Sequence, residues 1–239
     1  LVPKHLNVFH MRISLFFINW NDSFYLPFIK EHYGKFCEKI VMYDNFSSDD
    51  SFAMAKRLGF EVRNFGFRGQ LNDQCYLDVK NHCWKEERGK SDYVIVCDID
   101  EFLERPFNLS GSCPEVKGFN MISNNLPKDS VFEINTGSAD DQYSKQVIFD
   151  PNKIQEINYV HGCHKNNKIG EITSDSPLRL FHYRMIGGLD RLYGRHYQYQ
   201  LRMSQFNRKY NMGHHYLVAA DQKKFEWDYL QTKAVELWK

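Results

Sequence analysis

Residues 93–102 read Tyr-Val-Ile-Val-Cys-Asp-Ile-Asp-Glu-Phe, an apolar run that ends on two carboxylates one residue apart. A continuous run of β-branched and aromatic residues is typical of a strand buried on both faces, as in a parallel α/β sheet. Because side chains alternate along an extended chain, Asp98 and Asp100 should point to the same side and Ile99 to the core. Parallel sheets bind ligands beyond the carboxyl ends of their strands. The pair is therefore predicted to hold a hard divalent cation, Mn²⁺ or Mg²⁺, against substrate phosphates.

The chain before this stretch alternates between predicted strands and predicted helices. Strands are predicted at residues 12–19, 39–43 and 60–65, and helices at 23–33, from the polar turn 44–50 through residue 58, and at 71–87. Glycines follow the first two helices and serve as stop signals. Strand and helix alternating over roughly the first hundred residues predict a doubly wound, mostly parallel sheet flanked by helices.

Beyond this part the alternation fades. Residues 118–123 and 145–149 are strand-like, the segment between them is rich in loops, and aromatic and basic residues dominate after Leu178. We expect a C-terminal helical segment there, whose tyrosines either line a cleft or pack a helix on the sheet. No internal repeat or low-complexity linker divides the chain. The sequence therefore predicts a single domain over residues 1–239, with halves at about 12–105 and 106–239.

Composition narrows the class of partner. With 31 basic and 30 acidic residues the net charge is +1, which predicts no nucleic acid partner. No apolar window is long enough to span a bilayer, and the N-terminus lacks the features of a signal peptide. Glycosylation sequons at Asn21 and Asn45 would lie beside the predicted ligand edge, with another at Asn108. A cytoplasmic or membrane-peripheral location is expected, with the six scattered cysteines as free thiols.

The order of these motifs resembles the metal-dependent glycosyltransferases of the GT-A fold, in particular a family-2-like group with an Asp-X-Asp-Glu-Phe motif. Five segments carry the resemblance in order: residues 18–22, 43–50, 97–103, 144–148 with Pro151 and His161, and 180–184. It implies a Rossmann-like sheet that binds a nucleoside-diphosphate sugar of the UDP or GDP type in the first half. It also implies inverting transfer of a hexosyl or deoxyhexosyl group to a glycan or glycoprotein acceptor bound by the second half.

The resemblance also implies roles for individual residues. Asp98 and Asp100 would bind the metal, and among the histidines His161 is the first choice to complete the metal site. Donor contacts are expected from Asn21, Asp44, Asn72, Asp98, Lys145, His182 and Arg184. Each has an ordinary structural alternative, because Asn and Asp at strand ends and helix starts also form turns and caps. Exposed lysine and arginine are often simply solvated.

An inverting transferase needs a carboxylate that removes the proton of the acceptor hydroxyl. Asp140 and Asp141 form an adjacent pair in a glycine-containing loop, and Asp129 lies in the preceding turn. Each of these candidates could equally be loop surface. Glu101 is a further possibility, although its position beside the metal motif favours a supporting role.

Two other enzyme classes and one binding function share some of these features. A phosphohydrolase of the haloacid-dehalogenase type also places Asp-X-Asp at a strand end, but on an early strand and without the Glu-Phe that follows here. A nucleotidyltransferase would need a glycine-rich basic loop after the first strand, where this chain has Trp20-Asn21-Asp22. A carbohydrate-binding domain of the same fold without turnover remains a non-enzymatic alternative.

Overall fold

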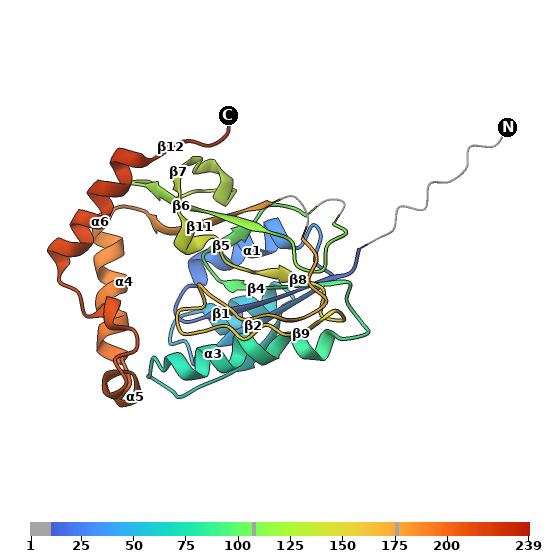
Figure 1. The fold of residues 1–239 in the computed structure, drawn as a ribbon. Helices are drawn as coiled ribbons and strands as arrows, with labels where there is room; N and C mark the ends of the chain where they lie inside the picture. Colours follow the sequence, from blue (N-terminus) through green and yellow to red (C-terminus); the bar gives the residue numbers. More distant parts are fainter. Residues whose placement is uncertain (1–10, 107–108, 175–176) are drawn as a thin grey trace.

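The computed structural model describes residues 11–106, 109–174 and 177–239 (Figure 1). The first half alternates as predicted through β1 (Ile13–Asn19), α1 (Leu26–Tyr33), β2 (Lys39–Asp44), α2 (Ser51–Arg57), β3 (Glu61–Asn64), α3 (Asp73–His82) and β4 (Tyr93–Asp98). The first and third predicted helices are shorter than expected. Ser23–Tyr25 and Cys83–Glu87 form 3₁₀ turns, at the start of the first and the end of the third.

The first sheet has the strand order β3-β2-β1-β4-β8. Its first four strands are parallel, and β8 (Ile148–Phe149) pairs antiparallel with β4. Of the strand predicted at residues 145–149, only these two residues are extended. The prediction of an α/β fold with a mostly parallel sheet between helices is confirmed.

A second sheet was not predicted from the sequence. Its order is β12-β7-β6-β11-β5, built from β5 (Glu101–Leu103), β6 (Val116–Ser123), β7 (Thr136–Ala139), β11 (Leu178–Ile186) and β12 (Val235–Glu236). Strands β6 and β11 are parallel, and the other pairs are antiparallel. Strand β11 is buried along nearly its whole length, although it contains His182 and Arg184. A small separate pair joins β9 (Ile154–Glu156) and β10 (Ile169–Gly170).

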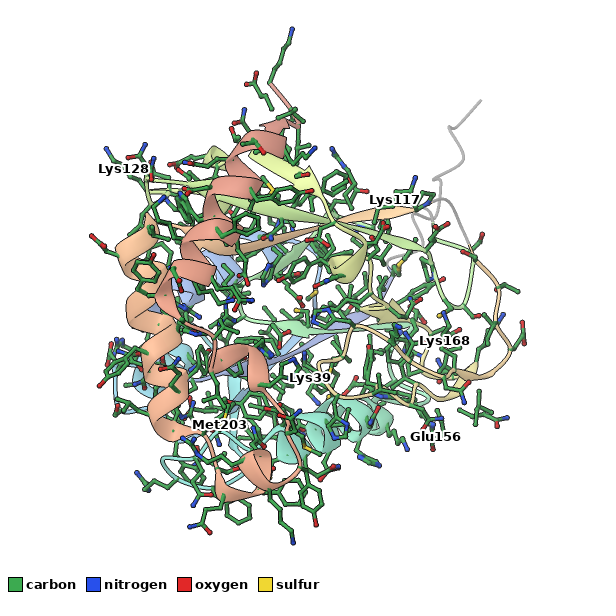
Figure 2. The ribbon with its side chains drawn as sticks, turned by 60° about the vertical axis from the view of Figure 1, so that its left-hand side comes forward. Lys39, Lys117, Lys128, Glu156, Lys168 and Met203 are labelled. Carbon is green, nitrogen blue, oxygen red and sulfur yellow. The ribbon has the colours of Figure 1, made fainter. Side chains whose placement is uncertain are left out.

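The predicted C-terminal helical segment is present as α4 (Leu189–Arg202), α5 (Gln205–Lys209) and α6 (Ala220–Lys233). Figure 1 shows α4 and α6 along one side of both sheets, with α5 near the start of α3. Met203, labelled in Figure 2, forms a parallel bridge with Leu71 just before α3. The C-terminal helices are therefore attached to the first half of the chain. Among the described residues, no helix has the length and apolar character needed to cross a membrane.

One apolar cluster runs through both sheets, from Leu15 and Ile95 in the first to Met121 and Leu180 in the second. Two fully buried tyrosines of the first half fix the second sheet against it. The Tyr25 hydroxyl donates to the Tyr183 carbonyl oxygen at 2.7 Å. The Tyr33 hydroxyl donates to the Glu101 carbonyl oxygen at 2.9 Å and accepts from the Leu103 amide at 2.8 Å. These bonds position β5, which follows the aspartate motif, and β11, which carries His182.

The six cysteines are free thiols, and all except Cys75 are buried. Asn45 is buried as well, and its side-chain amide donates to the Phe65 carbonyl oxygen at 2.9 Å. The folded chain therefore does not present the sequon at Asn45 for glycosylation. Asn108 lies outside the described residues.

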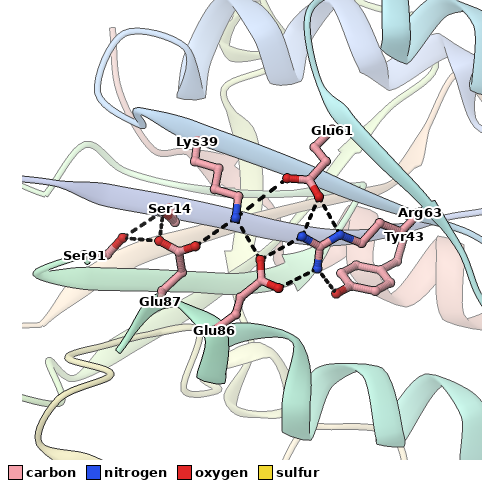
Figure 3. A network of polar contacts seen from close by, with 8 residues as sticks. All are labelled: Ser14, Lys39, Tyr43, Glu61, Arg63, Glu86, Glu87 and Ser91. Atoms are coloured by element: carbon pink, nitrogen blue, oxygen red, sulfur yellow. Dashed lines mark hydrogen bonds and ion pairs between the residues drawn. The ribbon is translucent and has the colours of Figure 1, made fainter. Parts of the chain in front are cut away.

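A network of charged side chains joins β2, β3 and the turn after α3 on the outside of the first sheet (Figure 3). Lys39 contacts Glu86 at 2.8 Å and Glu87 at 2.9 Å. Arg63 contacts Glu86 through both of its terminal nitrogens at 2.8 Å. Hydrogen bonds from Arg63 and Lys39 lower the pKa of Glu86 to about 2. The network therefore stabilises the folded chain while Glu86 is ionised.

We expect Glu86→Gln to lower the free energy of unfolding by about 1 kcal/mol at pH 7. A carboxyl whose pKa is depressed by folding contributes stability above its ordinary value of 4.5, and this is lost as the pH falls toward 2. The difference between wild type and Glu86→Gln, measured by urea unfolding, should shrink over that range. Glu115→Gln, at an exposed position outside the network, should show no such dependence. A constant difference between pH 7 and pH 2 would contradict this account.

Candidate active site at the carboxyl edge of the first sheet

The parallel register brings the ends of three neighbouring strands to one edge. Asn19 at the end of β1 pairs with Asp44 of β2, and Ile18 pairs with Asp98 of β4. Polar side chains that follow these strands therefore meet at the carboxyl edge of the sheet. This is the edge at which the sequence predicts a ligand site.

The residues after β1 and β2 that were predicted to bind the sugar donor form hydrogen bonds that hold the loops after these two strands together. Asp44 is buried. Its carboxylate accepts hydrogen bonds from the side-chain amide of Asn19 at 2.9 Å and from the backbone amide of Ser47 at 2.8 Å. The Asn21 side-chain oxygen accepts from the Ser48 amide at 2.7 Å, and Asn21 has φ 49°, which asparagine tolerates better than most residues. In these contacts Asp44 and Asn21 stabilise turns, which is the structural role that the sequence also allows for them. Their donor-binding role stays a prediction.

Asn72 is the N-cap of α3, where its side chain accepts hydrogen bonds from the backbone amides of Gln74 and Cys75. Loss of an N-cap typically costs about 1 kcal/mol. The structure therefore gives Asn72 a helix-capping role, and its contact with a donor also stays a prediction.

Asp98 is held by two lysines. Lys80 Nζ lies 2.6 Å from Oδ1 and Lys145 Nζ lies 3.1 Å from Oδ2. Lys145 also contacts Glu101 Oε1 at 2.5 Å, while Glu101 Oε2 accepts the Asp98 backbone amide at 2.9 Å. Both lysines and Glu101 are buried, whereas 37% of the Asp98 side chain is exposed. Burial opposes ionisation of Asp98, but the two ammonium groups outweigh it and hold its pKa below the ordinary value. We call these residues the lysine-carboxylate quartet.

Lys80 was missed by the sequence analysis, although the sequence contains a signal for it. Leu77, Lys80 and Trp84 are three and four residues apart, and all three are buried on one side of the helix that precedes β4. A lysine on an otherwise apolar stripe needs a partner inside the protein, because a buried unpaired ammonium group is very unfavourable.

Asp100 lies in a different environment from Asp98. Strand β4 ends at Asp98 and residues 99–100 form a turn, so the strand alternation used to align the two carboxylates does not extend to Asp100. Asp100 Oδ1 is 3.7 Å from His182 Nε2 on β11. Burial tends to raise the pKa of Asp100, but neighbouring positive charges, among them Arg195 and Arg184, hold it below the ordinary value.

His182 is held in one orientation. Its ring stacks on Tyr143 with centroids 4.0 Å apart, and its Nδ1 is 3.3 Å from the side-chain oxygen of Asn120. With Nδ1–H donating to that oxygen, Nε2 carries a lone pair that faces Asp100. Burial lowers the pKa of His182, which favours this neutral ring. Gly118 permits the arrangement, because a Cβ there would lie 2.1 Å from the Tyr143 carbonyl carbon.

Arginines of the second half surround the same edge. The Arg184 guanidinium carbon lies 5.3 Å from the Tyr199 ring centroid and 5.6 Å from that of Tyr216. Arg195 on α4 forms a two-pronged ion pair with Asp22, in which Nη2 is 2.5 Å from Oδ2. Burial nevertheless raises the pKa of Asp22 to about 6. Sequence reasoning did not identify Arg195, because no local motif reports that α4 packs against the loop after β1.

The remaining predicted residues are more scattered. His161 is exposed and lies within electrostatic range of Asp73, and it does not join Asp100 and His182. Asp140 is the N-cap of the short turn that contains Tyr143. Asp129 and Asp141 are exposed.

The donor atoms fit a divalent cation at one place. Two ligands that are each about 2.1 Å from an ion can be separated by up to about 4.2 Å, so Asp100 Oδ1 and His182 Nε2, 3.7 Å apart, can share one. In the described parts of the chain no group of three or more His, Cys, Asp or Glu residues is arranged as a metal site. Such an ion would therefore need phosphate oxygens and water to complete its shell, as is usual for Mg²⁺ at phosphate sites.

The chain was compared with known proteins in three ways. No model of a known protein family matches it, and no curated protein does. Among solved structures it is similar to glucosyl-3-phosphoglycerate synthase from Mycobacterium tuberculosis in complex with Mn²⁺, UDP and glucosyl-3-phosphoglycerate, with 15% identity and a TM-score of 0.33. The complex of that enzyme with Mn²⁺, UDP-glucose and phosphoglyceric acid is similar at 16% identity and a TM-score of 0.34. Both matches cover 46% of this chain and 44% of the other, so the chain spans less than half of those proteins. Likeness at this level supports no conclusion about function.

Glu101→Gln tests the lysine-carboxylate quartet. The substitution keeps the shape of the side chain but leaves buried Lys145 without its 2.5 Å partner. We expect the free energy of unfolding, measured with urea, to fall by about 3 kcal/mol. The matched control is Glu104→Gln, whose ion pair with Arg179 is partly exposed and should cost less than about 1 kcal/mol. Equal losses in the two variants would show that the quartet is not a buried charge network.

Proposed function

We propose that the protein is a metal-assisted glycosyltransferase that moves a sugar from a nucleoside diphosphate of the UDP or GDP type to a glycan acceptor. The observation that carries this proposal is the grouping of cations with Asp98 and Asp100 at the carboxyl edge of the first sheet. These cations are Lys80, Lys145, Arg184 and Arg195. Because carboxylates already pair with Lys80, Lys145 and Arg195, the positive charge for a diphosphate would come from Arg184 and from the divalent ion.

Asp100 and His182 would hold the divalent ion, which when bound would neutralise the charge that develops on the departing nucleoside diphosphate. An imidazole ligand favours Mn²⁺ over Mg²⁺, because Mg²⁺ prefers an all-oxygen shell. Asn120 would keep the lone pair of His182 Nε2 directed at the site. The support of Asn120 favours His182 over His161 as the imidazole ligand.

The lysine-carboxylate quartet would act beside the ion. Lys80 and Lys145, both buried, would hold the Asp98 carboxylate in place at the edge where the diphosphate is proposed to bind. Arg184, which lies beside the stacked rings of Tyr199 and Tyr216, has a planar guanidinium suited to two-pronged contact with phosphate oxygens. Inversion, the hexosyl or deoxyhexosyl donor, and a cytoplasmic or membrane-peripheral location belong to the same proposal.

For the catalytic base we favour Asp140 over Asp141 and Asp129. Asp140 begins the short turn whose Tyr143 stacks on His182, and its charge lies within electrostatic range of Tyr143. Asp140 is also partly buried, whereas Asp129 and Asp141 are exposed.

A thermal-shift measurement tests the donor and the metal together. We expect one of UDP, GDP or TDP, or its sugar conjugate, to raise the melting temperature by about 5 °C or more near hundredfold saturation, and only with Mn²⁺. Asp100→Asn and His182→Ala should abolish the Mn²⁺ dependence, and His161→Ala should retain it. If no nucleotide shifts a cooperative melt, the phosphohydrolase and carbohydrate-binding alternatives gain support. Hydrolysis of p-nitrophenyl phosphate would then distinguish those two.

Asp140→Asn tests the base. Removing a positioned general base typically lowers the rate by a factor of about 100 to 10,000, so kcat should fall in that range. Nucleotide binding in the thermal-shift measurement should be unchanged, because Asp140 does not contact the donor in this proposal. Asp141→Asn is the matched control at the neighbouring, more exposed residue. A larger loss in Asp141→Asn than in Asp140→Asn would reverse the assignment.

A further inference from the structure

A separate cavity of about 330 Å³ lies at the other end of the β5 and β11 strand pair. Its lining includes Glu104, which follows β5, and Arg179 near the start of β11. Register pairs His182 with Glu101 and Leu180 with Leu103. Arg179 is three residues from His182 along an extended strand, so the cavity lies about 10 Å from the carboxyl edge. It therefore takes no part in the proposed donor site.

Three aromatic rings form the apolar wall of this cavity. Trp238 packs against Phe181 with ring centroids 4.9 Å apart and planes at 67°, and against Phe132 at 6.0 Å. Phe132 and Phe181 lie at 90° to each other. The Trp238 indole nitrogen donates to the Phe132 carbonyl oxygen at 3.3 Å, which fixes the tryptophan ring. The rings thus make a rigid corner, and Phe132 and Trp238 are both partly exposed.

Polar groups of compensating charge face the same cavity. Glu104 accepts from the Arg179 backbone amide at 2.7 Å and from its guanidinium at 2.9 Å. This pair is partly exposed, with 44% of the Arg179 side chain and 27% of the Glu104 side chain accessible. The pair has no net charge and offers donors and acceptors next to each other. Arg105 also lines the cavity.

His32 supplies a further acceptor. Its Nε2 lies 2.7 Å from the Leu103 carbonyl oxygen, so this nitrogen carries the proton. Burial lowers the pKa of His32, which keeps the ring neutral and leaves Nδ1 with a lone pair. Within the described ranges Nδ1 has no hydrogen-bond partner. A ligand that donates from a hydroxyl group matches this atom.

We propose that this cavity binds one sugar ring of a glycan. The aromatic corner would take the apolar face of a pyranose, and the Glu104–Arg179 pair with His32 Nδ1 would bind its hydroxyl groups. The volume is at the lower end of the range for small-molecule sites, which suits a single ring. A multiply charged anion is disfavoured, because Glu104 already neutralises Arg179. This site goes beyond the proposed transfer reaction and does not depend on it.

Saturation-transfer difference NMR on the full chain, without nucleotide or metal, tests the proposal. The probes are the methyl glycosides of glucose, galactose, mannose, N-acetylglucosamine and rhamnose, with inorganic phosphate as a competing anion. We expect at least one glycoside to receive saturation and phosphate not to displace it. Trp238→Ala should raise its Kd about tenfold or more, and Glu104→Gln about fivefold through loss of a charge-assisted hydrogen bond.

Two controls keep the outcomes distinct. Tyr229→Ala removes an aromatic ring that is 57% exposed on α6, outside the cavity, and should leave the Kd unchanged. Asp100→Asn should also leave it unchanged, which separates this site from the donor site. Absence of saturation for every glycoside, displacement by phosphate, or equal effects of Trp238→Ala and Tyr229→Ala would overturn the proposal. Because Glu104→Gln keeps the shape of a partly exposed side chain, it tests binding even if Trp238→Ala folds poorly.

Discussion

The site depends on charge compensation among Lys80, Asp98, Lys145 and Glu101. Lys80, Lys145 and Glu101 are almost completely buried, and an isolated charge in such a place would be very unfavourable. Their contacts join α3, the end of β4, the start of β5 and the segment that leads into β8. If any of the four side chains moved, its partner would be left as an unpaired charge in a buried, apolar environment. The carboxyl edge of the first sheet is therefore fixed before any ligand binds.

This constraint gives the two motif aspartates different chemistry. The oxygens of Asp98 are matched by ammonium groups, whereas Asp100 faces the lone pair of His182 at a distance that a shared cation can span. The turn at residues 99–100 separates the two environments. The second sheet is necessary for this division, since His182 and its partner Asn120 come from β11 and β6.

The two halves of the chain form one edge together. Arg195 of α4 pairs with Asp22 after β1, and the Arg202 guanidinium lies 3.6 Å from the centroid of Trp20. Backbone bonds between Leu71 and the end of α4, at 2.7 and 2.9 Å, complete the attachment. The helices of the second half therefore cover the loops in which the sequence predicts donor binding, and any ligand there would contact both halves.

The sequence by itself determined the α/β class, the positions of the first four parallel strands, and the presence of a carboxylate pair where β4 ends. Hydrophobic periodicity and glycine stops are local signals, and they are strong where a strand is buried on both faces. Only the tertiary structure decided that Asp98 pairs with Lys80 and Lys145, that His182 and not His161 lies beside Asp100, and that β11 is a strand. Those outcomes depend on contacts between residues far apart in the chain, which no local pattern in the sequence reports.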